Sequence, residues 1–156
     1  MPDKKQIVSY VAIGLSGLNV LFCILALALN SWLDNGHSSF GLWEVCTGNA
    51  CVSWDIVAGW MDAVRAFAFL GLFAMVGATV TAVLYEFIIK GNNILLYLTL
   101  GLAAGAGFFM MIAFSVFADH SSGSYGAAFA LCIIAWLIGW AVAGLCVLIM
   151  FLNRTT

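Results

Sequence analysis

The chain has very little charge. Of its 156 residues, 8% are Asp, Glu, Lys or Arg and 65% are apolar, and the mean hydropathy is +1.12. A soluble domain carries roughly a quarter charged residues, so this composition excludes an ordinary soluble fold. The net charge of −2 and the five basic residues exclude a nucleic-acid-binding surface, which needs a cluster of Lys and Arg. We predict one domain, residues 1–156, whose main partner is the lipid bilayer.

Proline is also nearly absent, with 1 residue, whereas glycine is abundant, with 16. This combination is typical of helices that pack closely in lipid. Small residues recur at helical spacing, and we expect these pairs to pack within one bundle rather than form a dimerisation face: Gly101-x3-Gly105, Ala103-x3-Gly107 and Ala135-x3-Gly139.

The few charges leave four long stretches free of Asp, Glu, Lys and Arg, which lie between Lys5 and Asp34, Arg65 and Glu86, Lys90 and Asp119, and Asp119 and Arg154. A helix needs about 20 apolar residues to cross the hydrocarbon. We therefore predict four membrane-spanning helices, over 7–29, 64–88, 94–117 and 125–152. The loops 30–63 and 118–124 then lie on one side of the membrane.

No Asp, Glu, Lys, Arg or His lies deep in any predicted span. This disfavours a proton-coupled transporter, which needs titratable groups in the membrane. Asn19 lies in the middle of the first span, and we expect it to hydrogen-bond another helix because hydrocarbon offers no partner.

Motifs for catalysis or for a metal are missing. The chain contains no zincin, nucleophile-elbow or P-loop pattern. Two loop cysteines with His37 and His120 do not form a recognisable tetrahedral zinc set. We predict no enzymatic activity, no cofactor and no metal.

The basic residues predict the orientation. With four spans, Lys4, Lys5, Lys90 and Arg154 share one side and only Arg65 lies opposite. The positive-inside rule therefore predicts that both termini are cytosolic.

The first predicted exterior loop contains Cys46 and Cys51, separated by Thr47-Gly48-Asn49-Ala50. Gly48-Asn49 is typical of a two-residue hairpin turn. In that register Thr47 faces Ala50 and Cys46 faces Cys51 in a non-hydrogen-bonded pair, where Cα atoms come within disulfide range. An exterior loop is oxidising, so we predict a Cys46–Cys51 disulfide.

The other cysteines, Cys23, Cys132 and Cys146, lie in predicted spans and are interpreted as small apolar core residues. Whether Cys146, nearer the cytosolic end, is palmitoylated stays open.

Strand alternation in the hairpin predicts a face made of Trp43, Val45, Val52 and Trp54, which we expect to rest on the helix ends or on lipid. The opposite face, with the cysteines, is expected to look outward.

Two further features flank the hairpin. Trp32 and Trp60 also lie in or beside this loop, near the expected interfacial belt of tryptophans. The helical spacing of Asp62 and Arg65 predicts an ion pair on the exterior side.

These residues resemble a known family. Trp32, then Gly41-Leu42-Trp43, then Cys46 and Cys51 are similar to the W…GLW…C…C signature of the claudin, peripheral myelin protein and epithelial membrane protein superfamily. The Cys-x4-Cys form is most like that of the lens fibre membrane intrinsic protein. The segments 60–67 and 124–136 also resemble the starts of the family's second and fourth spans.

The resemblance implies an all-α membrane protein: a left-handed bundle of four transmembrane helices with a small extracellular antiparallel β-sheet. By position it makes Trp32, Gly41, Leu42, Trp43, Cys46 and Cys51 the loop signature, with Arg65 at the start of the second span. It also implies a plasma-membrane protein, at cell junctions in many members, that self-associates laterally or between cells.

Two functions follow as expectations. The first is a structural role in cell–cell adhesion, junction formation and membrane organisation, through homo-oligomers in the same or apposed membranes. The second is an auxiliary subunit of a channel or receptor complex. The first loop is shorter than in tight-junction claudins, and the final residue, Thr156, is not the hydrophobic one that a PDZ groove binds. Both departures argue against claudin-type strands anchored to scaffolds.

Overall fold

The computed structural model describes residues 4–28, 32–34, 38–40, 44–47, 50–53, 59–89, 92–120 and 125–155. The main helices are α1 (Lys4–Ala28), α2 (Gly59–Val83), α3 (Asn93–His120) and α4 (Ala127–Thr155), and α2 continues into a π-helical turn, η1 (Leu84–Ile88). All four are long and apolar enough to cross a membrane. The prediction of four helices that are long and apolar enough to span a membrane is therefore confirmed, and they indicate a multi-pass membrane protein.

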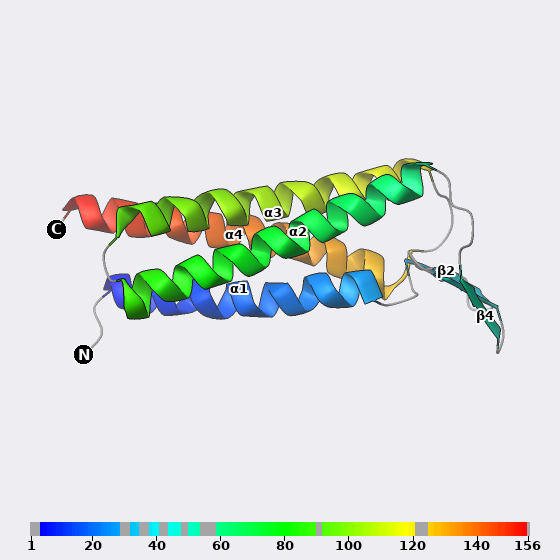
Figure 1. The fold of residues 1–156 in the computed structure, drawn as a ribbon, viewed down its shortest axis with the longest axis horizontal. Helices are drawn as coiled ribbons and strands as arrows, with labels where there is room; N and C mark the ends of the chain where they lie inside the picture. The colour runs from blue at the N-terminus through cyan, green and yellow to red at the C-terminus, as the bar shows by residue number, and fades with distance from the viewer. Residues whose placement is uncertain are drawn as a thin grey trace.

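The helices form a bundle in which neighbours in sequence are neighbours in space: α1 packs on α2, α2 on α3, α3 on α4, and α4 on α1. Figure 1 shows both chain ends and the α2–α3 connection at one end of the bundle, here called the terminal end. The strands lie beyond the opposite end, here called the sheet end. This is the arrangement expected for an even number of spans.

Helix boundaries follow local chemistry. Asn92 precedes α3, and its side-chain oxygen accepts a hydrogen bond from the Ile94 N–H at 3.0 Å, as an N-cap does. The second helix begins at Gly59 rather than at the predicted 64. Asp62 therefore lies in its first turn, where a carboxylate is favoured by the helix dipole.

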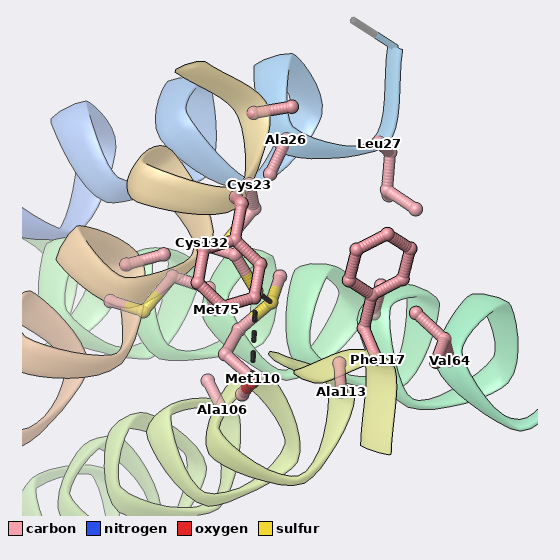
Figure 2. Close-up of a cluster of buried hydrophobic side chains, with 14 of the residues drawn as sticks. Cys23, Ala26, Leu27, Val64, Met75, Ala106, Met110, Ala113, Phe117 and Cys132 are labelled. Carbon is pink, nitrogen blue, oxygen red and sulfur yellow. Dashed lines mark hydrogen bonds between the residues drawn. The ribbon is translucent and has the colours of Figure 1, made fainter. Parts of the chain in front are cut away.

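The core is built from small residues and sulfur-containing side chains. Figure 2 shows Cys23, Met75, Met110 and Cys132 among buried alanines. The Cys132 thiol donates to the Met110 carbonyl oxygen at 3.6 Å and lies 3.6 Å from the Met110 sulfur. Cys23, Cys132 and Cys146 are free and buried, as predicted for core residues.

Two of the three small-residue pairs pack within the bundle. A Cβ at Gly139 would lie 3.1 Å from the Ala103 oxygen and from Gly107 backbone atoms, and a Cβ at Gly107 would lie 3.1 Å from the Trp136 oxygen. These glycines allow α3 and α4 to approach closely.

The prediction was wrong for Gly101 and Gly105. A Cβ at either position would meet no atom within 4 Å, because both face away from the bundle.

Polar groups inside the bundle join helices, as predicted for Asn19. Its side-chain nitrogen donates to the Ala135 oxygen on α4 at 3.1 Å and lies 3.1 Å from the Met75 sulfur on α2. The Thr81 and Thr99 hydroxyls, on α2 and α3, lie 2.6 Å apart. Such bonds satisfy polar groups for which hydrocarbon offers no partner.

Large apolar side chains lie exposed on the outer faces of all four helices, for example Leu21, Phe73, Leu98 and Leu137. An apolar surface of this extent on a soluble protein would cause aggregation, whereas in a bilayer it contacts acyl chains.

Four short strands form one antiparallel sheet in the order β1 (Leu33–Asp34), β2 (Ser38–Phe40), β3 (Glu44–Thr47) and β4 (Ala50–Ser53). In β3 and β4 the Cα partners include Thr47 with Ala50 and Cys46 with Cys51. This is the register predicted from the Gly48-Asn49 turn. Among the described strands, β1 and β4 are the edges of the sheet.

Candidate functional site

The candidate site is the sheet together with the helix ends that hold it. Trp32, immediately before β1, makes the connection. Its side chain is fully buried, and its indole N–H donates to the Ala26 oxygen near the end of α1 at 2.7 Å. A tryptophan N–H that is removed from water needs such a partner.

Aromatic side chains from α3 and α4 enclose this indole. The ring centroid of Phe117 lies 4.9 Å from that of Trp32, and the centroid of Phe129 lies 5.9 Å away. Tyr125 stacks on Phe129 with centroids 4.2 Å apart. The Gly126 N–H also donates to the Trp32 carbonyl oxygen at 3.0 Å, which ties the start of α4 to the start of the sheet.

The tryptophan therefore belongs to the protein core. It lies at the end of the bundle, as expected, but its surface is covered by Phe117, Phe129 and α1 instead of being exposed to the membrane interface. Phe117 was not singled out from the sequence, and its only signal was that it is an aromatic residue at the end of a predicted span. Phe129 lies in the segment 124–136, which resembles the start of the family's fourth span, but its packing on Trp32 was not predicted.

The hairpin of β3 and β4 extends beyond this core (Figure 1). Cys51 is disulfide-bonded, and Cys46 is its Cα partner across the ladder. The Cys46 side chain lies outside the described side chains, so the bond between these two residues stays a prediction.

The exposure of β4 bears on the expectation for the two faces of the hairpin. Val52 is 65% exposed, and Cys51, on the opposite face, is exposed as well. Val52 therefore does not rest on the helix ends, and contact of its face with lipid, the other part of the expectation, stays a prediction. Trp43 and Trp54, which would share this face, lie outside the described residues, as do Gly41 and Leu42.

The predicted ion pair is present on α2. An Arg65 guanidinium nitrogen lies 3.6 Å from an Asp62 carboxylate oxygen. The Arg65 side chain is 16% exposed and that of Asp62 is 65% exposed, so the pair lies at the edge of the bundle. Solvent-exposed pairs contribute little to stability, and its position at the start of α2 is the more informative feature.

Within the part of the chain that the structure describes, no group of three or more His, Cys, Asp or Glu residues could hold a metal ion. At the sheet end the described residues present an edge strand, β4, and an exposed valine on it, Val52.

None of the protein-family models matches this chain, and no curated protein matches it either. The resemblance of the first loop to a known family therefore rests on the signature residues themselves.

The disulfide leads to a prediction about export. Cys46→Ser should lower the amount of protein at the cell surface several-fold, because the hairpin loses the constraint on its register, worth about 2 kcal/mol for so short a loop. Surface labelling of intact cells measures this. Cys23→Ala, which removes a buried thiol from α1, is the control and should reach the surface almost normally. Equal surface levels of Cys46→Ser and the parent would contradict a structural disulfide.

Proposed function

We propose that this chain is a structural protein of the plasma membrane that supports cell–cell contact and membrane organisation by associating with copies of itself. In this proposal it belongs to the claudin and peripheral myelin protein superfamily, the bundle is left-handed, the termini are cytosolic and the sheet is extracellular. The proposal does not involve an enzyme, a cofactor or a nucleic acid.

The observation that carries the proposal is the exposed edge strand β4. In a hairpin closed by a two-residue turn, Val52 pairs with Val45 and directs its backbone groups toward β3, whereas Cys51 and Ser53 direct theirs away from β3. Among the described strands none pairs with this outer edge, and the outer edge of a sheet is a template for another strand. Ala50, Cys51 and Val52 are all exposed, so the strand is accessible to a partner.

The attachment of the sheet to the helix bundle favours the same function. Burial of Trp32 and its hydrogen bond to α1 anchor the start of β1 to the bundle, and β4 is the edge of the sheet on the side away from this anchor. A second copy presents the same edge, and two copies related by a two-fold axis would pair β4 with β4 in antiparallel fashion.

The test uses a proline that blocks the edge and spares the hairpin. Ser53→Pro removes an N–H that points away from β3, a place where sheets tolerate proline. Cells that express the parent should aggregate with one another, and cells that express Ser53→Pro at equal surface level should aggregate no more than cells without the protein. Val52→Asp, which places charge on the exposed face, should act in the same direction.

Two results would reject the adhesion proposal. One is aggregation of Ser53→Pro cells equal to that of parent cells. The other is the absence of aggregation by the parent itself at high surface level.

An auxiliary subunit of a channel or receptor is the second candidate, and the outward face of α3 favours it. Gly101 and Gly105 leave open space on that face, which would let a helix of another protein approach closely. Stoichiometric co-isolation of a large channel from native membrane, lost in Gly101→Leu, would support this function over self-association.

A further inference from the structure

A groove lies at the terminal end of the bundle, far from the sheet. It has a volume of about 450 Å³ and is lined by the first turns of α3 and the last turns of α4, through Asn93, Leu96, Tyr97, Met150 and Arg154. This size is within the range of small-molecule sites in proteins. We propose that the groove binds the phosphodiester headgroup of an anionic membrane lipid.

The first argument for this ligand is the positive charge in the groove. Arg154 is exposed, and within the described residues its guanidinium has no carboxylate within ion-pair distance. None of the described residues that line the groove is acidic. Among the described residues, the only acidic one at the terminal end is Glu86, on η1, and it is not part of the groove lining. A guanidinium is planar and directs paired N–H donors, a geometry that matches phosphate oxygens.

Neutral hydrogen-bond donors and the N-terminus of α3 also favour an anion in the groove. Asn93 has an amide NH₂ and Tyr97 a hydroxyl, and both residues line the groove. The N-terminus of α3 contributes partial positive charge. Because Asn92 already accepts from the Ile94 N–H, this end acts through its dipole and not through that N–H.

The apolar part of the groove selects a lipid over free phosphate. Leu96, which lines the groove with Met150, is 3% exposed, and the flanking Ile94 and Phe151 are 67% and 60% exposed. Tyr97 is 59% exposed, in the position that tyrosines favour at the boundary between headgroups and acyl chains. A soluble phosphate would leave this apolar surface uncovered, whereas the glycerol and acyl carbons of a lipid would cover it. The lipid-binding proposal requires that the protein lies in a bilayer, but it does not require that the protein mediates adhesion.

The test measures lipid binding to the full-length protein in detergent by native mass spectrometry. Dioleoylphosphatidylglycerol should bind more tightly than dioleoylphosphatidylcholine. Arg154→Gln should weaken phosphatidylglycerol binding about five-fold, the effect of one basic residue near an anionic lipid surface. Met150→Trp, which fills the groove and keeps the charge, should weaken it as well.

The matched control is Lys4→Gln, which removes an exposed basic residue from α1 at the same end of the bundle but outside the groove lining. It should leave phosphatidylglycerol binding within two-fold of the parent. Thermal unfolding of each variant, expected to match that of the parent for Arg154→Gln, separates lost binding from lost structure.

Three results would overturn the proposal. Equal weakening by Lys4→Gln and Arg154→Gln would show diffuse attraction to the membrane. Equal affinity for the two lipids would remove the role of the anionic headgroup. Displacement of the lipid by millimolar glycerophosphoglycerol, the soluble headgroup, would show that the groove takes free phosphate esters instead of a lipid.

Discussion

Trp32→Ala should lower the free energy of unfolding by about 3–5 kcal/mol, the range for truncating a fully buried aromatic side chain. The side chain has no exposed surface, and it is enclosed by Phe117, Phe129 and the end of α1. Its removal leaves a cavity where three helices and the sheet meet. The measurement is thermal or denaturant unfolding of the purified protein in detergent.

Trp32→Phe separates the hydrogen bond from the packing. It keeps an aromatic ring between Phe117 and Phe129 but removes the N–H that donates to the Ala26 oxygen. The lost hydrogen bond should cost about 1 kcal/mol, with a further loss for the smaller ring. Unfolding should therefore be earliest for Trp32→Ala, intermediate for Trp32→Phe and latest for the parent.

The control is Val52→Ala on the exposed face of β4. Val52 is 65% exposed, so its truncation should change stability by less than about 0.5 kcal/mol. If Trp32→Ala unfolded no earlier than Val52→Ala, the tryptophan would not be the anchor of the sheet.

The spans could be predicted because the bilayer allows few alternatives. Hydrocarbon cannot satisfy backbone groups, so a long uncharged stretch forms a helix. All four charge-free stretches did so, with ends that differ from the prediction by a few residues, as at Gly59. The hairpin register was equally determined by local chemistry, since the two residues between Thr47 and Ala50 fix which residues face one another.

The surroundings of Trp32 could not be predicted by the same reasoning. A tryptophan beside a span has the same local sequence whether it faces lipid headgroups or fills the end of a bundle. The residues that decide between these places, Phe117 and Phe129, come from α3 and α4, far along the chain. Only the tertiary arrangement brings them to the end of α1.

Glycine spacing also does not predict what the glycines contact in the folded protein. Gly101-x3-Gly105 and Ala135-x3-Gly139 are equivalent patterns, yet Gly105 faces open space whereas Gly139 touches α3 backbone. Spacing shows that small residues share a helix face, but the rotation of the helix in the bundle decides what that face meets.

Gly139→Val should be the most damaging substitution in the middle of the bundle. A Cβ there would lie 3.1 Å from the Ala103 oxygen and 3.1 Å from the Gly107 Cα and nitrogen. All three are backbone atoms, so no side chain can rotate away, and α3 and α4 must separate. Overpacking of this kind typically costs about 1–3 kcal/mol and can cost more. The separation would also disturb the Cys132 contact with Met110 between the same helices. Unfolding in detergent measures the loss, with Gly139→Ala expected to lie between Gly139→Val and the parent.

The matched controls are Gly101→Val and Gly105→Val on α3. They make the same chemical change in a membrane-spanning helix, but the added atoms would meet nothing within 4 Å at Cβ. Their stability should stay within about 0.5 kcal/mol of the parent, as for substitutions that touch no neighbour. If Gly139→Val and Gly101→Val unfolded together, the close approach of α3 and α4 at Gly139 would be refuted. If the outward substitutions left unfolding unchanged but abolished co-isolation of a partner, the two glycine faces would have separate roles, one in packing the bundle and one in association.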